Sequence, residues 1–152
     1  MQQYLGTKLI EARPLTRASY NALRGWTLPE GEDGDDEGYL VEYMDGGKPN
    51  HEDYAGYISW SPKAQFEAAY RPTDGMSFGL AVEALKRGKK VARSGWNGKG
   101  TFVFLVNGST FKVNRPPLLG SAPFIALYAA DHRLVPWHAS QTDILAVDWS
   151  IL

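Results

Sequence analysis

The residues best suited to chemistry lie in the second half of the chain, beginning with a glycine-rich turn. Residues 95–100 read GWNGKG, with glycines at 95, 98 and 100. This spacing fits neither the dinucleotide fingerprint nor the Walker loop, and no helix follows to place its dipole behind a phosphate. We read the segment as a hairpin turn that exposes Trp96, because a large aromatic side chain at a turn must either fold back or meet a ligand.

Two histidines further along could supply acid–base chemistry. His132 and His138 stand near Asp131 and Asp143 in the sequence, which is enough to assemble an acid–base pair on paper. No nucleophile is spaced to complete a triad, so we favour surface or structural roles for both histidines. The sequence therefore predicts no catalytic residue.

A metal site is also disfavoured. The acidic, glycine-rich stretch 29–38, PEGEDGDDEG, clusters carboxylates, but its spacing is not that of a calcium loop and a solvated loop is the better interpretation. Cysteine is absent, which excludes disulfide frameworks, thiol catalysis and thiolate zinc sites. We expect neither a metal nor a cofactor.

The composition indicates a soluble globular protein. The chain has 152 residues, of which 43% are hydrophobic and 22% charged, the usual balance for such proteins. No apolar run is long enough to span a membrane, and the first residues lack the basic start and apolar stretch of a secretory signal. We therefore expect a cytosolic protein without a membrane partner.

Charge is distributed unevenly along the chain. Residues 1–72 carry seven Lys/Arg and twelve Asp/Glu, a net charge of −5, whereas residues 73–152 carry nine and five, a net charge of +4. The split predicts two modules with these boundaries, the second suited to an anionic partner, although a dipolar protein without a charged ligand is the plain alternative. The positive charge is modest and no Lys/Arg run marks a nucleic-acid track, so nucleic acid is not an expected partner.

The hydrophobic patterns predict an α+β protein, a helix-plus-antiparallel-sheet module preceded by a second small α+β module. Capping residues mark the helices, with Thr16, Ser61 and Ser77 at the starts and Gly25 and Gly88 at the ends. In the first module we expect strands over 8–13, 38–45 and 55–60 and helices over 17–24 and 62–71. In the second we expect a helix over 78–87, strands over 89–94, 101–106, 124–130, 133–137 and 147–152, and a helical turn over 140–146.

Three segments of the second module carry a family resemblance. They read MSFGLAVEALKRGKKVARSGWNGKG at 76–100, FVFLVNGSTFKVNRPPLL at 102–119 and VPWHASQTDILAVDW at 135–149. In this order they closely resemble the phage-encoded family of the second Thoeris anti-defence protein, a signal sponge. The resemblance covers residues 76–152. The first module resembles an uncharacterised phage module, which implies no activity.

The resemblance implies a function in the cytoplasm of an infected bacterium. Proteins of this family form homo-oligomers, typically tetramers, and bind cyclic ADP-ribose isomers such as glyco-cyclic ADP-ribose, which Thoeris enzymes release. They hold the signal without cleaving it, and some members are similar to sponges that also sequester cyclic dinucleotides of CBASS. The alternative is an enzyme that degrades the same signal, but the basic module lacks Cys, is poor in His and has no carboxylate cluster.

Chemistry and motif positions together predict the ligand contacts. Aromatic rings can stack on bases, worth roughly 1–3 kcal/mol each, while cations, including Lys99, can neutralise phosphates and polar side chains can read hydroxyls and base edges. For Trp137 and Trp149, packing in the core is the stronger alternative. The predicted ligand-binding residues are Phe78, Arg93, Trp96, Asn97, Lys112, Arg115, Trp137, Ser140, Thr142 and Asp143.

Overall fold

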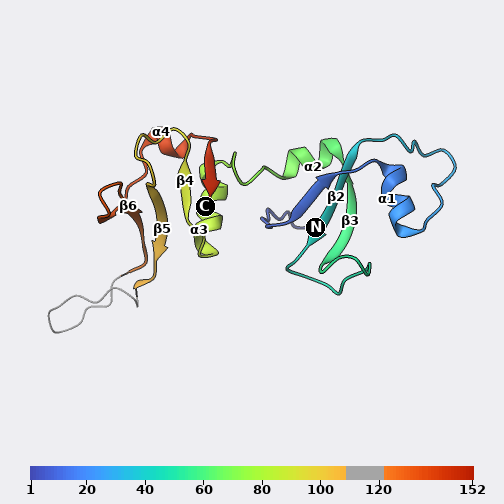
Figure 1. The fold of residues 1–152 in the computed structure, drawn as a ribbon, viewed down its shortest axis with the longest axis horizontal. Coiled ribbons are helices and arrows are strands. Elements are labelled where there is room, and N and C mark those ends of the chain that lie inside the picture. The colour runs from blue at the N-terminus through green and yellow to red at the C-terminus, as the bar shows by residue number, and fades with distance from the viewer. Residues whose placement is uncertain (109–121) are drawn as a thin grey trace. The chain divides into compact units, whose positions relative to one another are not determined.

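A computed structural model describes residues 1–108 and 122–152 of the chain. They form two compact units, Met1–Tyr70 and Arg71–Leu152 (Figure 1). Each unit combines helices with one antiparallel sheet, which confirms the predicted α+β class. The predicted ligand residues Lys112 and Arg115 lie outside the described residues.

The first unit is built on a three-stranded sheet in the order β1-β2-β3. Its strands are β1 (Glu11–Pro14), β2 (Gly38–Tyr43) and β3 (Tyr57–Pro62), and pairing of Glu11 with Glu42 and of Tyr39 with Ser61 sets the register. The predicted first strand, 8–13, is therefore displaced toward the C-terminus. Its bounds follow from the backbone of β2, which pairs with residues 11–14.

Two helices pack on this sheet. The α1 helix (Arg17–Arg24) has the predicted bounds, because the Thr16 side chain accepts a bond from the Ser19 N–H and Gly25 adopts the left-handed conformation at φ 67°. The α2 helix (Lys63–Ala69) is shorter than predicted. Its N-cap position is Pro62 rather than Ser61, without a side-chain cap, and the backbone becomes extended at Tyr70.

The second unit has a five-stranded sheet in the order β7-β6-β5-β4-β8. The strands are β4 (Val91–Arg93), β5 (Phe102–Val106), β6 (Phe124–Tyr128), β7 (Leu134–Pro136) and β8 (Trp149–Ile151). The α3 helix (Phe78–Lys86) begins after Ser77, whose side chain makes no cap bond, and the short α4 helix (Gln141–Ile144) precedes β8.

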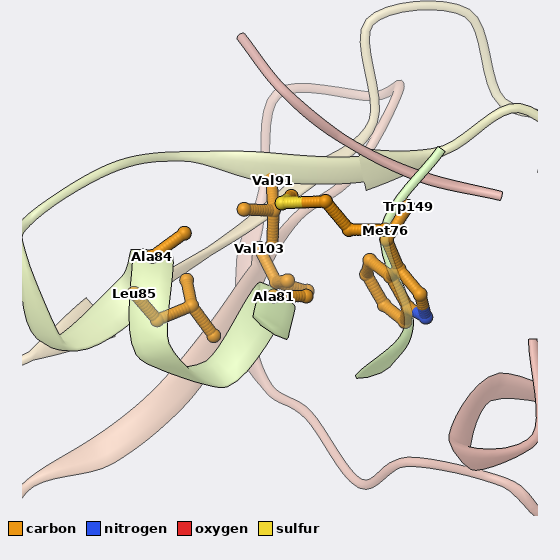
Figure 2. Packing of buried hydrophobic residues seen from close by; sticks show 7 residues of the cluster. All are labelled: Met76, Ala81, Ala84, Leu85, Val91, Val103 and Trp149. Atoms are coloured by element: carbon orange, nitrogen blue, oxygen red, sulfur yellow. The ribbon is translucent and has the colours of Figure 1, made fainter. Parts of the chain in front are cut away.

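The core of this unit lies between α3 and one face of the sheet. Figure 2 shows Val91 and Val103 of neighbouring strands facing Ala81 and Leu85 of α3. Trp149 of β8 belongs to the same core and is fully buried, so the prediction that it packs in the core is confirmed. The core thereby fixes the last residues of β4 and the first residues of β8, and the candidate site lies next to both.

Residues 73–76 close the β8 edge of the sheet. Met76 and Trp149 exchange two backbone hydrogen bonds of 2.8 and 3.1 Å, and the Ile151 N–H donates to the Thr73 carbonyl at 2.8 Å. The segment before α3 is therefore part of the sheet of this unit rather than a free connection.

The other face of the sheet carries an aromatic surface. Strand alternation places Phe102, Phe104 and Val106 on the face opposite Val103, and Phe102 stacks on Tyr128 of β6 at 5.0 Å between ring centroids. Phe102 and Phe104 are half-buried. In the described parts of this unit, both helices lie on the Val103 side, so this aromatic face has no helix over it.

Candidate functional site

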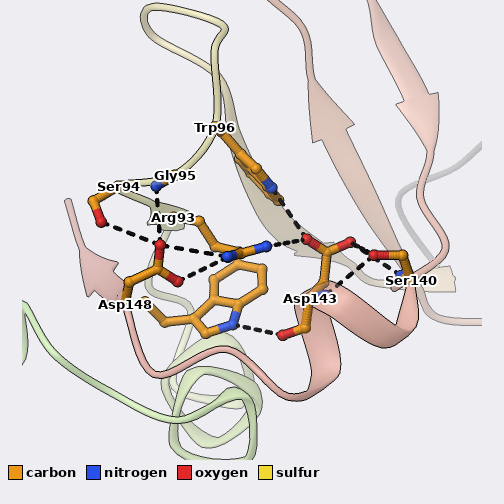
Figure 3. Close-up of polar contacts among 8 residues, drawn as sticks. Arg93, Ser94, Gly95, Trp96, Ser140, Asp143 and Asp148 are labelled. Atoms are coloured by element: carbon orange, nitrogen blue, oxygen red, sulfur yellow. Dashed lines mark hydrogen bonds and ion pairs between the residues drawn. The ribbon is translucent and has the colours of Figure 1, made fainter.

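Arg93, the last residue of β4, lies at the centre of a polar network in the second unit. Its Nη1 donates to Asp143 Oδ1 at 2.9 Å, while Nε and Nη2 donate to the two carboxylate oxygens of Asp148 at 2.8 and 3.4 Å (Figure 3). The Arg93 side chain is only 13% exposed. Hydrogen bonds to Asp148 and Asp143 raise the pKa of this guanidinium, which is thus held by two carboxylates of its own chain.

Asp143 connects Arg93 to α4. Its carboxylate accepts bonds from the Ser140 hydroxyl at 2.7 Å and the Ser140 N–H at 3.0 Å, and its own N–H donates to Ser140 Oγ at 3.1 Å. This reciprocal pair is a capping box, which explains why a helix of four residues begins at Gln141. Asp143 therefore caps α4.

Asp143 stays ionised despite being nearly buried. Burial by itself would raise the pKa of Asp143, but hydrogen bonds from Ser140, Arg93 and Trp96 lower it to about 2. The third of these partners, the Trp96 indole, donates its Nε1–H to Asp143 Oδ1 at 3.2 Å. A carboxylate with this pKa is a permanent hydrogen-bond acceptor at neutral pH and a poor proton carrier.

Asp148 holds the glycine-rich turn and is absent from the predicted set. Its carboxylate accepts bonds from the Gly95 N–H at 2.9 Å and the Ser94 hydroxyl at 3.1 Å, besides those from Arg93. The Arg93 hydrogen bonds lower its pKa. The signal that could have found it is its place in the LAVDW end of the motif, directly before the core residue Trp149.

Gly95 has little room for a side chain. A Cβ atom at this position would lie 3.1 Å from Asp148 Oδ2 and 3.4 Å from Arg93 Nη2. The first is tighter than ordinary carbon–oxygen contacts in proteins, so a side chain would press directly on the two charged groups. Close approach of the backbone to the Arg93–Asp148 pair therefore accounts for glycine here.

Four aromatic rings pack beside the network. Trp96 lies edge-to-face against Trp149 at 5.3 Å and Trp137 at 5.9 Å, and Phe78 contacts Trp149 at 5.5 Å. The Trp96 indole is half-buried, so the expectation of an exposed indole at the turn was wrong. It folds back because the Asp143 carboxylate accepts a hydrogen bond from its N–H and its ring packs against two other indoles.

The structure brings most of the predicted ligand residues together. Phe78 and Trp137 are half-buried, and Trp137 contacts both Phe78 and Trp96. Asn97 is exposed on the turn, and Thr142 is exposed on α4. Lys99 is exposed at the far end of the same turn. The buried part of the site is therefore aromatic and ionic, while its exposed part is polar.

In the described residues, neither His132 nor His138 hydrogen-bonds to this network. His132 occupies the β6–β7 turn with φ 64°, and its Nδ1 is 2.8 Å from the Tyr128 hydroxyl. Asp131, the carboxylate considered above as an acid–base partner of His132, instead accepts a 2.6 Å hydrogen bond from Arg133. His138 is exposed. No group of three or more His, Asp or Glu side chains suited to a metal occurs in the residues that the structure describes.

Comparison with known proteins identifies the second unit. Residues 76–152 match the sequence model of the Thoeris anti-defense 2-like domain, which spans just over half of the chain and includes the whole Arg93 network. The chain belongs to the Thoeris anti-defense 2-like family. Membership gives it a role in phage anti-defence, the coarse function that the sequence motifs predicted.

One curated relative matches about half of the chain over almost the whole of its own length. It is Thoeris anti-defense 2 of Bacillus phage SP01, 42% identical over 86 residues that cover 51% of this chain and 94% of the phage protein. About half of the present chain thus has no counterpart in that relative. In the described ranges 1–108 and 122–152, no helix is long and apolar enough to cross a membrane.

Proposed function

We propose that the Thoeris anti-defense 2-like domain binds cyclic nucleotide immune signals, foremost the cyclic ADP-ribose isomers of Thoeris, and holds them uncleaved in the cytoplasm of the infected host. The observation that carries this proposal is the buried contact of Arg93 with Asp143. It joins the end of β4, directly before the glycine-rich turn, to α4, so that two distant motif segments present one surface.

A surface fixed in this way suits affinity. Trp96, Asn97 and Thr142 belong to segments that are held by the Asp143 and Asp148 carboxylates. Binding a ligand to such a surface orders few additional side chains, which lowers the entropic cost of association. A sponge requires tight binding and no turnover, and preorganisation serves that requirement.

The structure suggests how the roles are divided. We assign ring stacking to the cluster of Trp96, Trp137 and Phe78, and hydrogen bonding to ligand hydroxyls or base edges to Asn97 and Thr142. Arg93 already satisfies two carboxylates, so we assign it the positioning of the turn and α4. Phosphate neutralisation then falls to Lys99, Lys112 and Arg115 among the predicted residues.

The ionisation of the network supports binding without cleavage. A general acid or base works best with a pKa near the operating pH. Asp143 has a pKa of about 2, and Asp148 is also shifted downward by Arg93. Both carboxylates are engaged in holding structure, which favours a binding protein over an enzyme that degrades the signal.

We further propose that the domain acts as a homo-oligomer, with a tetramer as the expected form. Phe102, Phe104 and Tyr128 form an aromatic sheet face without a helix over it in the described residues. Faces of this kind are stabilised by association, because a small domain buries a limited core alone. A second copy covering this face would also bring two ligand surfaces into one assembly.

The test is recovery of intact ligand. Purified full-length protein is mixed with glyco-cyclic ADP-ribose, unbound ligand is removed by ultrafiltration, and the protein is denatured. We expect intact ligand to be released, whereas cleavage products would establish an enzyme and failure to retain ligand would contradict the proposal. Cyclic dinucleotides form a second arm, and Arg133→Met, at an exposed ion pair outside the site, is the matched control.

A further inference from the structure

The first unit repeats one arrangement at the two ends of α1. At its first residue, the Arg17 guanidinium lies over the Trp60 ring, 5.1 Å from the centroid. At its last residue, the Arg24 guanidinium lies over the Trp26 ring at 4.6 Å. Stacking on an indole desolvates one face of a guanidinium and leaves the N–H groups at its edge to be satisfied.

The two arginines differ in how those N–H groups are satisfied. Arg17 forms an ion pair with Glu32 through Nε and Nη2. Arg24 forms no ion pair with a carboxylate in the part of the chain that the structure describes, and its Nη1 is buried without a hydrogen-bond partner. An unpartnered buried donor is unfavourable, and more so when it is charged.

The neighbourhood makes this missing partner informative. Residues 1–70 carry twelve Asp/Glu and six Lys/Arg, so carboxylates are plentiful in this unit. Lys8 and Lys63 each pair with one, Asp45 and Glu37 respectively. Arg24 interacts instead with the Tyr20 hydroxyl. Burial raises the pKa of Tyr20, and the charge of Arg24 and its hydrogen bond partly offset that rise.

Trp26 supplies the second half of a site. It is 54% exposed although it is a tryptophan, with Arg24 over one face and Tyr20 edge-on at 6.1 Å. Its backbone N–H donates to the Asn21 carbonyl at 2.8 Å, so the loop that carries it is fixed to α1. An exposed ring on a fixed backbone is ready for stacking.

We propose that Arg24 and Trp26 form a binding site for an oxyanion carried on a flat ring, the chemistry shared by nucleoside monophosphates and aromatic carboxylates. The ring stacks on Trp26, and the oxyanion draws the guanidinium of Arg24 outward so that Nη1 gains its partner. The strongly acidic unit repels polyanions, which favours a ligand of low charge over a nucleic-acid strand. This site is independent of the function proposed for the other unit.

The experiment follows the indole N–H signals of the full-length protein by heteronuclear NMR. The Trp26 signal is assigned by its loss in Trp26→Leu, and the protein is titrated with adenosine 5′-monophosphate and, separately, with indole-3-acetate. We expect the Trp26 signal to move with one or both probes, and the stronger probe distinguishes phosphate from carboxylate. Adenosine and inorganic phosphate alone should bind at least about ten-fold more weakly, because each lacks half of the recognition.

Variants decide whether Arg24 is responsible. Arg24→Met keeps a stem over Trp26 and should weaken probe binding about ten-fold or more, whereas Arg17→Met, at the carboxylate-paired twin, should leave it unchanged. If Arg24→Met fails to fold, Trp26→Leu with binding followed by calorimetry tests the ring half of the same site, and unchanged binding would overturn the proposal. An unmoved Trp26 signal at millimolar probe, or equal losses in both arginine variants, would overturn the proposal.

Discussion

Arg93 Nη1 and Asp143 Oδ1 lie 2.9 Å apart, although fifty positions separate the two residues in the chain. The side chains are 13% and 12% exposed, so both charges are largely withdrawn from water. In such a pair each partner makes burial of the other tolerable, and removing one leaves an uncompensated charge. The glycine-rich turn and α4 are therefore stabilised together or not at all.

Arg93→Met should destabilise the second unit by about 3 kcal/mol, since it leaves Asp143 and Asp148 without their shared cation. Urea unfolding followed by Trp fluorescence measures this. Arg133→Met removes an arginine from a pair whose cation is 80% exposed, and should change stability little. Equal effects of the two substitutions would show that the Arg93 network contributes no more than a surface pair.

Stability should fall in acid through Asp143. Its folded pKa of about 2 lies below the ordinary value of 3.8, so its contribution is complete above about pH 4 and is lost as the pH falls toward 2. The shift corresponds to about 2 kcal/mol. Asp143→Asn should lower stability at pH 7 and flatten the acid decline, as measured by thermal unfolding between pH 2 and 7.

The control for that series is Asp35→Asn, which removes one charge from the exposed acidic stretch. It should retain the acid decline of the natural protein. A decline of the same size in Asp143→Asn would assign the acid sensitivity to other carboxylates, with Asp148 as the next to test because its pKa is also lowered.

Local sequence signals were sufficient to predict most of the fold. Thr16 and Gly25 delimit α1 through side-chain and backbone caps, and both act within four residues of the helix ends. Where a boundary depended on a distant partner, the predicted boundary was wrong, because the pairing with β2 decides where β1 begins and ends. Periodicity reports which residues alternate, whereas pairing decides where a strand begins.

The site shows the same limit more sharply. Residue type predicted Arg93 as a phosphate ligand and Trp96 as an exposed stacking ring, because each side chain was judged alone. The structure gives both of them to Asp143, which stands some fifty positions away in the sequence. No periodicity in the sequence encodes these contacts. Asp148 was missing from the predicted ligand residues for the same reason, because its partner Arg93 is distant in the chain.

Trp96 should combine a ligand contact with a structural one. Trp96→Ala is expected to weaken binding of a cyclic ADP-ribose isomer about ten-fold or more, from the roughly 1–3 kcal/mol of a stacking ring. Trp96→Phe retains a ring between Trp137 and Trp149 but loses the bond to Asp143, and should bind at an intermediate level. Calorimetry measures binding and thermal unfolding reports folding. Unchanged binding with a large loss of stability would make Trp96 purely structural.

Self-association should depend on the aromatic sheet face. At micromolar concentration, light scattering should give a mass above that of one 16.8 kDa chain, and Phe104→Lys should reduce it by placing a charge on that face. Leu5→Lys is the control, because it puts the same charge on a fully exposed apolar residue of the first unit. A monomeric natural protein, or an assembly indifferent to Phe104→Lys, would contradict the proposed interface.

The final prediction is that residues 71–152 bind the signal alone. Every predicted ligand residue falls in this segment, and the family match, residues 76–152, lies within it. The cut must precede Thr73, because its carbonyl accepts the Ile151 N–H and residues 73–76 complete the β8 edge. The segment carries ten Lys/Arg and five Asp/Glu, so losing the acidic first unit should also modestly favour association with an anionic ligand at low salt.

Calorimetry with glyco-cyclic ADP-ribose, carried out on the full-length protein and on the segment, tests this prediction, with circular dichroism confirming that the segment is folded. A folded, assembled segment that binds nothing would mean that the first unit contributes to the ligand site.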